Sequence, residues 1–128
     1  MVTTIEFPRT HRLSQVYFGT DETLAIVGRD ANSLRMLFRY SKPKDGTISD
    51  RIRLPDDNEL IGAHWDDTGR LFVATNDSET VKVYRWDDSS WTLTSTANEP
   101  SGAVLFSPSF TMLDNSTPVV TWEAFFPH

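Results

Sequence analysis

The sequence predicts an all-β fold of one compact domain, and three observations carry that prediction. Apolar residues recur with a period of two, turn-forming residues separate the alternating segments, and no stretch of ten residues carries a helical stripe. The chain has 128 residues, of which 38% are hydrophobic and 12% aromatic, so it can bury a sizeable core. We therefore expect about eleven or twelve short strands.

The alternating segments predict half-buried strands in chain order. Between Thr47 and Leu54, we expect Ile48, Ile52 and Leu54 on one face and the arginines at 51 and 53 on the other. The same alternation, rich in β-branched and aromatic residues, predicts further strands at Thr3–Phe7, Leu34–Tyr40, Ala63–Trp65, Leu71–Ala74, Thr80–Tyr84, Trp91–Thr94, Val104–Phe106, Thr111–Leu113 and Val119–Phe126.

Runs of Gly, Pro, Asp and Ser between these segments predict turns at residues 19–22, 42–46, 66–69 and 87–90. Three of the connections contain paired acids, which are Asp56-Asp57, Asp66-Asp67 and Asp87-Asp88. None of these pairs continues as the alternating ligand loop that wraps a calcium ion. We therefore expect capped, solvated turns there and no metal site.

An internal repeat with an offset of 47 residues relates two stretches of the chain. The identical pairs are Ile5 and Ile52, Pro8 and Pro55, Leu13 and Leu60, Leu24 and Leu71, and Asp30 and Asp77. A third, shorter copy matches Val104–Pro108 to Ala63–Asp67 at an offset of 41. A period of about 40–50 residues with four short strands is typical of β-propeller blades. The equivalence predicts that Leu24, Ile26, Leu71 and Val73 are buried on the second strand of their sheets.

These segments resemble the WD40-like β-propeller family. The motifs that carry the resemblance are Phe106-Ser107-Pro108, the turn at residues 66–69, Leu71-Phe72-Val73-Ala74 and Thr80-Val81-Lys82-Val83-Tyr84. The resemblance implies four-stranded antiparallel blades, with about three blades in this chain. The outer strand at 3–7 precedes blade one at 15–54, blade two at 62–96 and blade three at 103–126. The last blade then lacks its outer strand. The resemblance implies that a strand from elsewhere takes that place and closes the ring.

About three blades are too few for a closed ring, because propellers have typically 4–8 blades. An open arc would expose an apolar face at each end, more than monomers usually tolerate. We therefore expect a two-fold head-to-tail homodimer that forms a six-bladed ring. In it, Thr3–Phe7 of one chain pairs with Val119–Phe126 of the other.

The charge pattern favours a protein partner. A net charge of −6 argues against a nucleic-acid surface, and no apolar run is long enough to cross a membrane. In a propeller, the loops before the first strand and between the second and third strands share one rim. The charged residues expected on that rim, and therefore the candidates for partner binding, are Arg9, Arg12, Arg29, Asp30, Asp57 and Asp77. Without a signal peptide or cysteines, we expect a cytoplasmic location.

Carbohydrate binding is the alternative. Trp65, Trp86 and Trp91 could stack on sugars between blades, although cross-strand packing explains the last two as well.

No catalytic motif is present, so we expect no enzyme, no cofactor and no metal. The histidines at 11, 64 and 128 are scattered along the chain. A hydrolase remains the third possibility, because the hairpin Phe38–Ser49 is similar to one found in seven-bladed lactonases.

Overall fold

The fold is all-β and antiparallel, as the sequence predicts. The computed structural model describes residues 12–19, 23–40, 48–77, 79–98, 104–113 and 117–125. These residues form ten strands and no helix, so no helix among them could span a membrane. The expected strand at Thr3–Phe7 and the expected turn at 42–46 lie outside the described residues.

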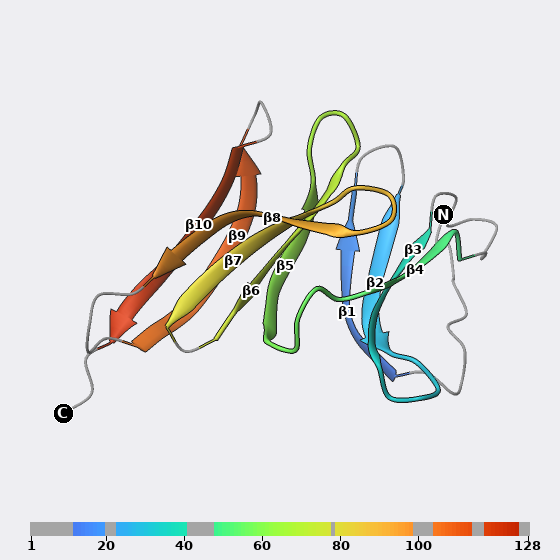
Figure 1. Ribbon diagram of the computed structural model, residues 1–128, viewed down its shortest axis with the longest axis horizontal. Coiled ribbons are helices and arrows are strands. Elements are labelled where there is room, and N and C mark those ends of the chain that lie inside the picture. The colour runs from blue at the N-terminus through green and yellow to red at the C-terminus, as the bar shows by residue number, and fades with distance from the viewer. Residues whose placement is uncertain are drawn as a thin grey trace, which may run out of the picture. The chain divides into compact units, whose positions relative to one another are not determined.

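The chain divides into two compact units, Met1–Asp57 and Asn58–His128. The first unit holds one four-stranded meander of β1 (Arg12–Phe18), β2 (Leu24–Arg29), β3 (Arg35–Tyr40) and β4 (Asp50–Arg53) (Figure 1). The second unit holds a four-stranded meander of β5 (Glu59–Trp65), β6 (Leu71–Asn76), β7 (Thr80–Trp86) and β8 (Trp91–Asn98). It also holds a separate two-stranded sheet of β9 (Val104–Leu113) and β10 (Thr117–Phe125).

The two meanders repeat each other in detail over their first two strands. The bounds of β5 and β6 lie 47 residues after those of β1 and β2. A β-bulge falls between Leu13 and Gln15 in β1, and another falls between Leu60 and Gly62 in β5, again 47 residues apart. Since bulges bend a strand and increase its twist, the repeat extends from sequence to local backbone shape.

The first sheet buries apolar side chains on both faces. On one face, Leu24, Ile26, Phe38 and Tyr40 form a cluster against which Ile48 packs. On the other face, buried Val27, Leu37 and Ile52 are aligned in cross-strand register.

The expectation that Ile48 and Ile52 share a face is therefore wrong. Regular pairing begins only at Asp50, so the alternation that placed Ile48 and Ile52 together does not run through this segment. Ser49 precedes the strand, and its backbone N–H donates to the Arg39 carbonyl at 2.7 Å. Leu54 lies just beyond Arg53, the last residue of β4, and is buried.

The second unit has its most buried strand at β6, in which all six residues are buried. Phe72 and Ala74 on β6 pack with Val83 and with Phe110 of β9. Leu71 and Val73 point to the opposite face of the sheet and are fully buried. The predicted burial of Leu24, Ile26, Leu71 and Val73 on second strands is confirmed.

The third repeat differs from its expected form. The segment Val104–Leu113 is one continuous strand, whereas the sequence predicted two separate strands at Val104–Phe106 and Thr111–Leu113. The β9–β10 register shifts between Thr121 and Glu123, opposite the segment that contains Pro108. A bulge accommodates the missing N–H of proline, so Pro108 does not end the strand.

Candidate functional site

A polar cleft of about 270 Å³ lies within the first unit. Its lining comes from the end of β2, the β2–β3 turn, the start of β3 and the segment that follows β4. The lining residues are Arg29, Ser33, Leu34, Arg35, Arg53, Leu54, Asp56 and Asp57. Three arginines and two aspartates give these walls a formal charge of +1 in a chain whose net charge is −6.

Strand register brings Arg29 and Arg35 together. Arg29 on β2 is the direct cross-strand partner of Arg35 on β3, and Arg12 on β1 occupies the position opposite Arg29. Directly opposite side chains lie on one face of a sheet, so Arg29 and Arg35 share a face.

The β2–β3 turn is held by Asp30. Its Oδ1 accepts hydrogen bonds from the backbone N–H groups of Asn32 at 2.8 Å and Leu34 at 3.0 Å. Ser33 adopts a φ of 63°, and its carbonyl accepts a 2.8 Å hydrogen bond from Nη1 of Arg29. This turn fixes one edge of the cleft and the direction of the Arg29 side chain.

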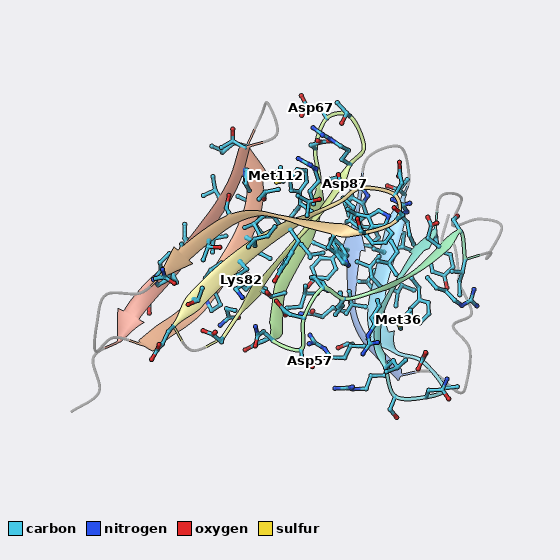
Figure 2. All side chains as sticks on the ribbon, in the orientation of Figure 1. Met36, Asp57, Asp67, Lys82, Asp87 and Met112 are labelled. Atoms are coloured by element: carbon cyan, nitrogen blue, oxygen red, sulfur yellow. The ribbon has the colours of Figure 1, made fainter. Side chains whose placement is uncertain are left out.

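The opposite edge is acidic. Asp56 is half-buried and Asp57 is exposed, and both follow β4, whose last residue is Arg53 (Figure 2). The cleft thus has cationic groups from the sheet end beside anionic groups from this segment. Such a surface can bind a polar ligand and discriminate by charge.

The structure places only some of the predicted rim residues at the cleft. Arg29 and Asp57 line the cleft, and Asp30 shapes its turn. Arg12 is placed by backbone register alone, and Arg9 lies outside the described residues.

Asp77 lies in the equivalent turn of the second sheet. There its Oδ1 accepts hydrogen bonds from the N–H groups of Glu79 at 2.8 Å and Thr80 at 2.7 Å. Both bonds stabilise the charged form, and they lower the pKa of the Asp77 carboxyl.

Sequence reasoning missed Arg35 and Arg53. The signal that could have found Arg35 is the Asp30 turn, because a short turn after Arg29 places the first residue of the next strand opposite it. Arg53 was predicted on a strand face, which gave no indication that the chain after β4 closes a cleft.

The equivalent end of the second sheet is not basic. In the first sheet, Arg12, Arg29 and Arg35 occupy three neighbouring positions across β1, β2 and β3. The same three positions of the second sheet hold Glu59, Asn76 and Val81. Asn76 is 9% exposed, and its Nδ2 donates to the Asp77 carbonyl at 3.1 Å. Its buried Oδ1 has no hydrogen-bond partner among the described residues.

A second charged cluster lies at the other end of the second sheet, on the β5–β6 and β7–β8 turns; Asp67 and Asp87 mark these turns in Figure 2. Asp66 has a fully buried side chain and accepts from Thr68 Oγ1 at 2.7 Å and Arg70 Nε at 3.0 Å. Burial raises the pKa of this carboxyl, but the hydrogen bonds from Thr68 and Arg70 outweigh it and lower the pKa to about 2.

The expectation of a solvated turn at residues 66–69 is therefore wrong for Asp66, although Asp67 is exposed. Asp66 is the acceptor that organises the turn, including the Gly69 backbone at a φ of 85°. On the neighbouring turn, Arg85 and Asp87 form an ion pair at 2.7 Å, and Thr92 Oγ1 donates to Asp87. Hydrogen bonds from Arg85 and Thr92 lower the pKa of Asp87.

Three of the four tryptophans gather at this same end of the second sheet. Trp86 and Trp91 are cross-strand partners whose rings meet edge to face, with centroids 5.0 Å apart. Trp65 lies opposite Leu71, and all three indoles are half-buried. The edge-to-face geometry is that of a stabilising aromatic pair.

His64 packs its ring edge to face on Phe110, at 5.3 Å between centroids. His11 and His128 lie outside the described residues. Among the residues that the structure describes, no three His, Cys, Asp or Glu side chains are grouped as metal ligands would be.

Comparisons of this chain with protein-family models, with curated proteins and with solved structures gave no match.

Proposed function

We propose that this chain is a non-enzymatic protein-interaction module built on a WD40-like β-propeller, with a ring that a second copy completes. The observation that carries the proposal is the repetition of a four-stranded antiparallel meander whose first two strands share bounds and a bulge at an offset of 47. Propeller blades are four-stranded sheets repeated along a chain, and this repetition supports the assignment. In this assignment β1–β4 and β5–β8 are two blades, and β9–β10 belong to a third.

Burial on both faces of the first sheet is the pattern expected of a propeller blade. In the first sheet, Phe38 and Leu37 point to opposite faces and each is 0% exposed. A propeller blade has this property because it packs between two others. About three blades leave an arc with apolar ends, so we propose the homodimeric, six-bladed ring in which Thr3–Phe7 of one chain pairs with Val119–Phe126 of its partner.

The mass of the protein in solution tests the ring. Sedimentation equilibrium at micromolar concentration should give about twice the 14.6 kDa of one chain. Deletion of residues 1–8 should give a monomer that binds a hydrophobic dye. A folded monomer of the full chain would contradict the ring.

The interaction role is supported by the charged rim. Arg29, Asp30 and Asp57 are on or beside the cleft, where charge sets association rates and partner choice. Reversing the charges of Arg12 and Arg29 should slow association with a protein partner and reduce its dependence on salt. Binding that ignores both reversals would place the partner surface elsewhere.

Carbohydrate binding is the second candidate, supported by the position of Trp65, Trp86 and Trp91 at one end of one sheet. A sugar that stacks there should change tryptophan fluorescence in the intact protein, and Trp91→Phe should reduce that change. A panel of neutral and acidic sugars without effect would remove this candidate.

A further inference from the structure

We propose that the cleft at the β2–β3 end of the first sheet binds a carboxylate of a partner peptide, with Arg29 and Arg35 as the recognising pair. This inference rests on the proposed interaction function and names the chemistry of the bound segment. The cleft lies wholly within Met1–Asp57, so it does not depend on the ring.

The fold does not require arginines at this end of the first sheet. In the second sheet, Glu59 and Asn76 lie 47 residues after Arg12 and Arg29, and Val81 pairs with Asn76 as Arg35 pairs with Arg29. That sheet has the same bulge, and its first two strands have the same lengths. Arg29 and Arg35 lie directly opposite each other, so their guanidinium groups can reach the same bound anion.

A guanidinium carries five N–H donors in a planar fork that matches a carboxylate in a bidentate manner. Arg29 uses Nη1 on the Ser33 carbonyl, an interaction that orients the side chain and leaves further donors. Arg35 and Arg53 line the same cleft and add donors and positive charge.

The cleft selects its ligand by size and by charge. A volume of about 270 Å³ is small for a drug-sized ligand and suits a single acidic side chain or a terminal carboxylate. Asp56 and Asp57 repel a second negative charge beside the first. The cleft therefore favours an isolated carboxylate over a polyanion such as nucleic acid.

The probes are three capped or uncapped glycine-rich pentapeptides, titrated into the full-length protein and followed by amide chemical shifts. One has a single glutamate and blocked ends, one has a glutamine in its place, and one has only glycines with a free C-terminal carboxylate. We expect the glutamate peptide to bind at least about tenfold more tightly than the glutamine peptide and to shift the amides of Ser33, Leu34 and Arg35. The free-carboxylate peptide distinguishes a C-terminus from a side chain as the source of the group.

The matched variants separate the cleft from general charge. R29Q/R35Q should weaken glutamate-peptide binding by about tenfold or more. R51Q/K82Q removes the same charge elsewhere, since Arg51 and Lys82 are not among the cleft-lining residues, and should weaken binding by less than about twofold. Equal losses in the two pairs, or equal binding of the glutamate and glutamine peptides, would overturn the proposal.

If R29Q/R35Q fails to fold, Asp57→Asn keeps the proposal testable, because Asp57 is exposed. Removing this rim charge should tighten glutamate-peptide binding about two- to threefold, whereas Asp67→Asn on a turn of the second unit should not. No change, or weaker binding, with Asp57→Asn would count against the cleft. Peptide binding by a protein that sediments as a monomer would support the cleft and reject only the ring.

Discussion

The two four-stranded sheets share a backbone plan and differ in where they concentrate charge. The first two strands of each sheet have the same lengths, and their bounds lie 47 residues apart. Both first strands carry a bulge at the equivalent place. In each sheet an aspartate caps the turn after the second strand, Asp30 in one and Asp77 in the other. The first sheet gathers arginines at that turn. The second gathers an ionic cluster around the buried Asp66 at the opposite end, where the first sheet has Gly19 in the equivalent position.

This difference separates what the fold needs from what the surface adds. Features present in both sheets, such as the bulge and the aspartate cap, satisfy backbone groups and shape the strands. Features present in one sheet serve that sheet alone. The Arg29–Arg35 row creates a cleft, and the Asp66 cluster fixes two turns.

The outer strands differ as well. β4 has four residues, of which three are charged, and β8 has eight residues with no charge and a bulge between the partners of Val83 and Tyr84. Short charged strands and bulges are two ways to discourage unwanted pairing at a sheet edge. Thr94 lies at the bulge, and its Oγ1 donates to the Val83 carbonyl at 3.1 Å.

The largest expected effect is on the shared core. Leu71→Ala should reduce the free energy of unfolding by about 2–5 kcal/mol, because Leu71 is fully buried on the second strand of its sheet. Leu24→Ala, the equivalent change in the first sheet, should fall in the same range. Chemical denaturation measures both.

Leu93→Ala is the matched control, since Leu93 is 50% exposed on β8. It should change stability by less than about 0.5 kcal/mol. A loss at Leu71 no larger than that at Leu93 would reject the assignment of β6 as a buried second strand.

The next effect is a pH dependence confined to the second sheet. The pKa of Asp66 is lowered to about 2 from an ordinary value of 3.8, so its carboxylate stabilises the folded state above pH 3.8. That contribution, on the order of 2 kcal/mol, should be lost as the pH falls from 3.8 toward 2. Urea unfolding of the parent protein and Asp66→Asn at several pH values measures it.

Asp66→Asn should be less stable at neutral pH and should lose less stability on acidification. Asp67→Asn, which changes an exposed neighbour, should keep the acid dependence of the parent protein. An unchanged acid dependence in Asp66→Asn would show that other carboxyls dominate.

The smallest effect compares the two turn caps. Asp30→Ala and Asp77→Ala each remove two backbone hydrogen bonds at an exposed turn. Each should lower the thermal midpoint by a similar amount, and by less than Asp66→Ala does, since Asp66 is buried and accepts from both Thr68 and Arg70. If the two variants lowered the thermal midpoint by different amounts, the structural equivalence of the two sheets would hold for the strands and not for these turns.

Much of the fold follows from the sequence because strand periodicity and the 47-residue offset are local patterns. They correctly placed Leu24 and Leu71 in equivalent buried positions. The errors arose where a strand departs from regular pairing. Ile48 changes face because β4 starts after it, and Pro108 is accommodated by a shift in strand register.

The candidate site was predicted only in part. Arg29 and Asp57 were expected on a charged rim. Arg35 lines the cleft because the β2–β3 turn places it opposite Arg29, and Arg53 lines it because the chain closes the cleft after β4. Asp66 could not be distinguished from Asp67 by sequence, because burial of one acid in a polar turn depends on the surrounding donors. Three-dimensional placement of those donors determined its role.

The repeat of strand and bulge is most directly tested by cross-strand proton contacts in isotopically labelled full-length protein. The account predicts contacts of Leu13 with Gly28 and Gln15 with Val27, and of Leu60 with Thr75 and Gly62 with Ala74, with Ser14 and Ile61 each skipped in the register. Uninterrupted pairing through Ser14 or Ile61, or a bulge in only one of the two strands, would contradict the shared plan.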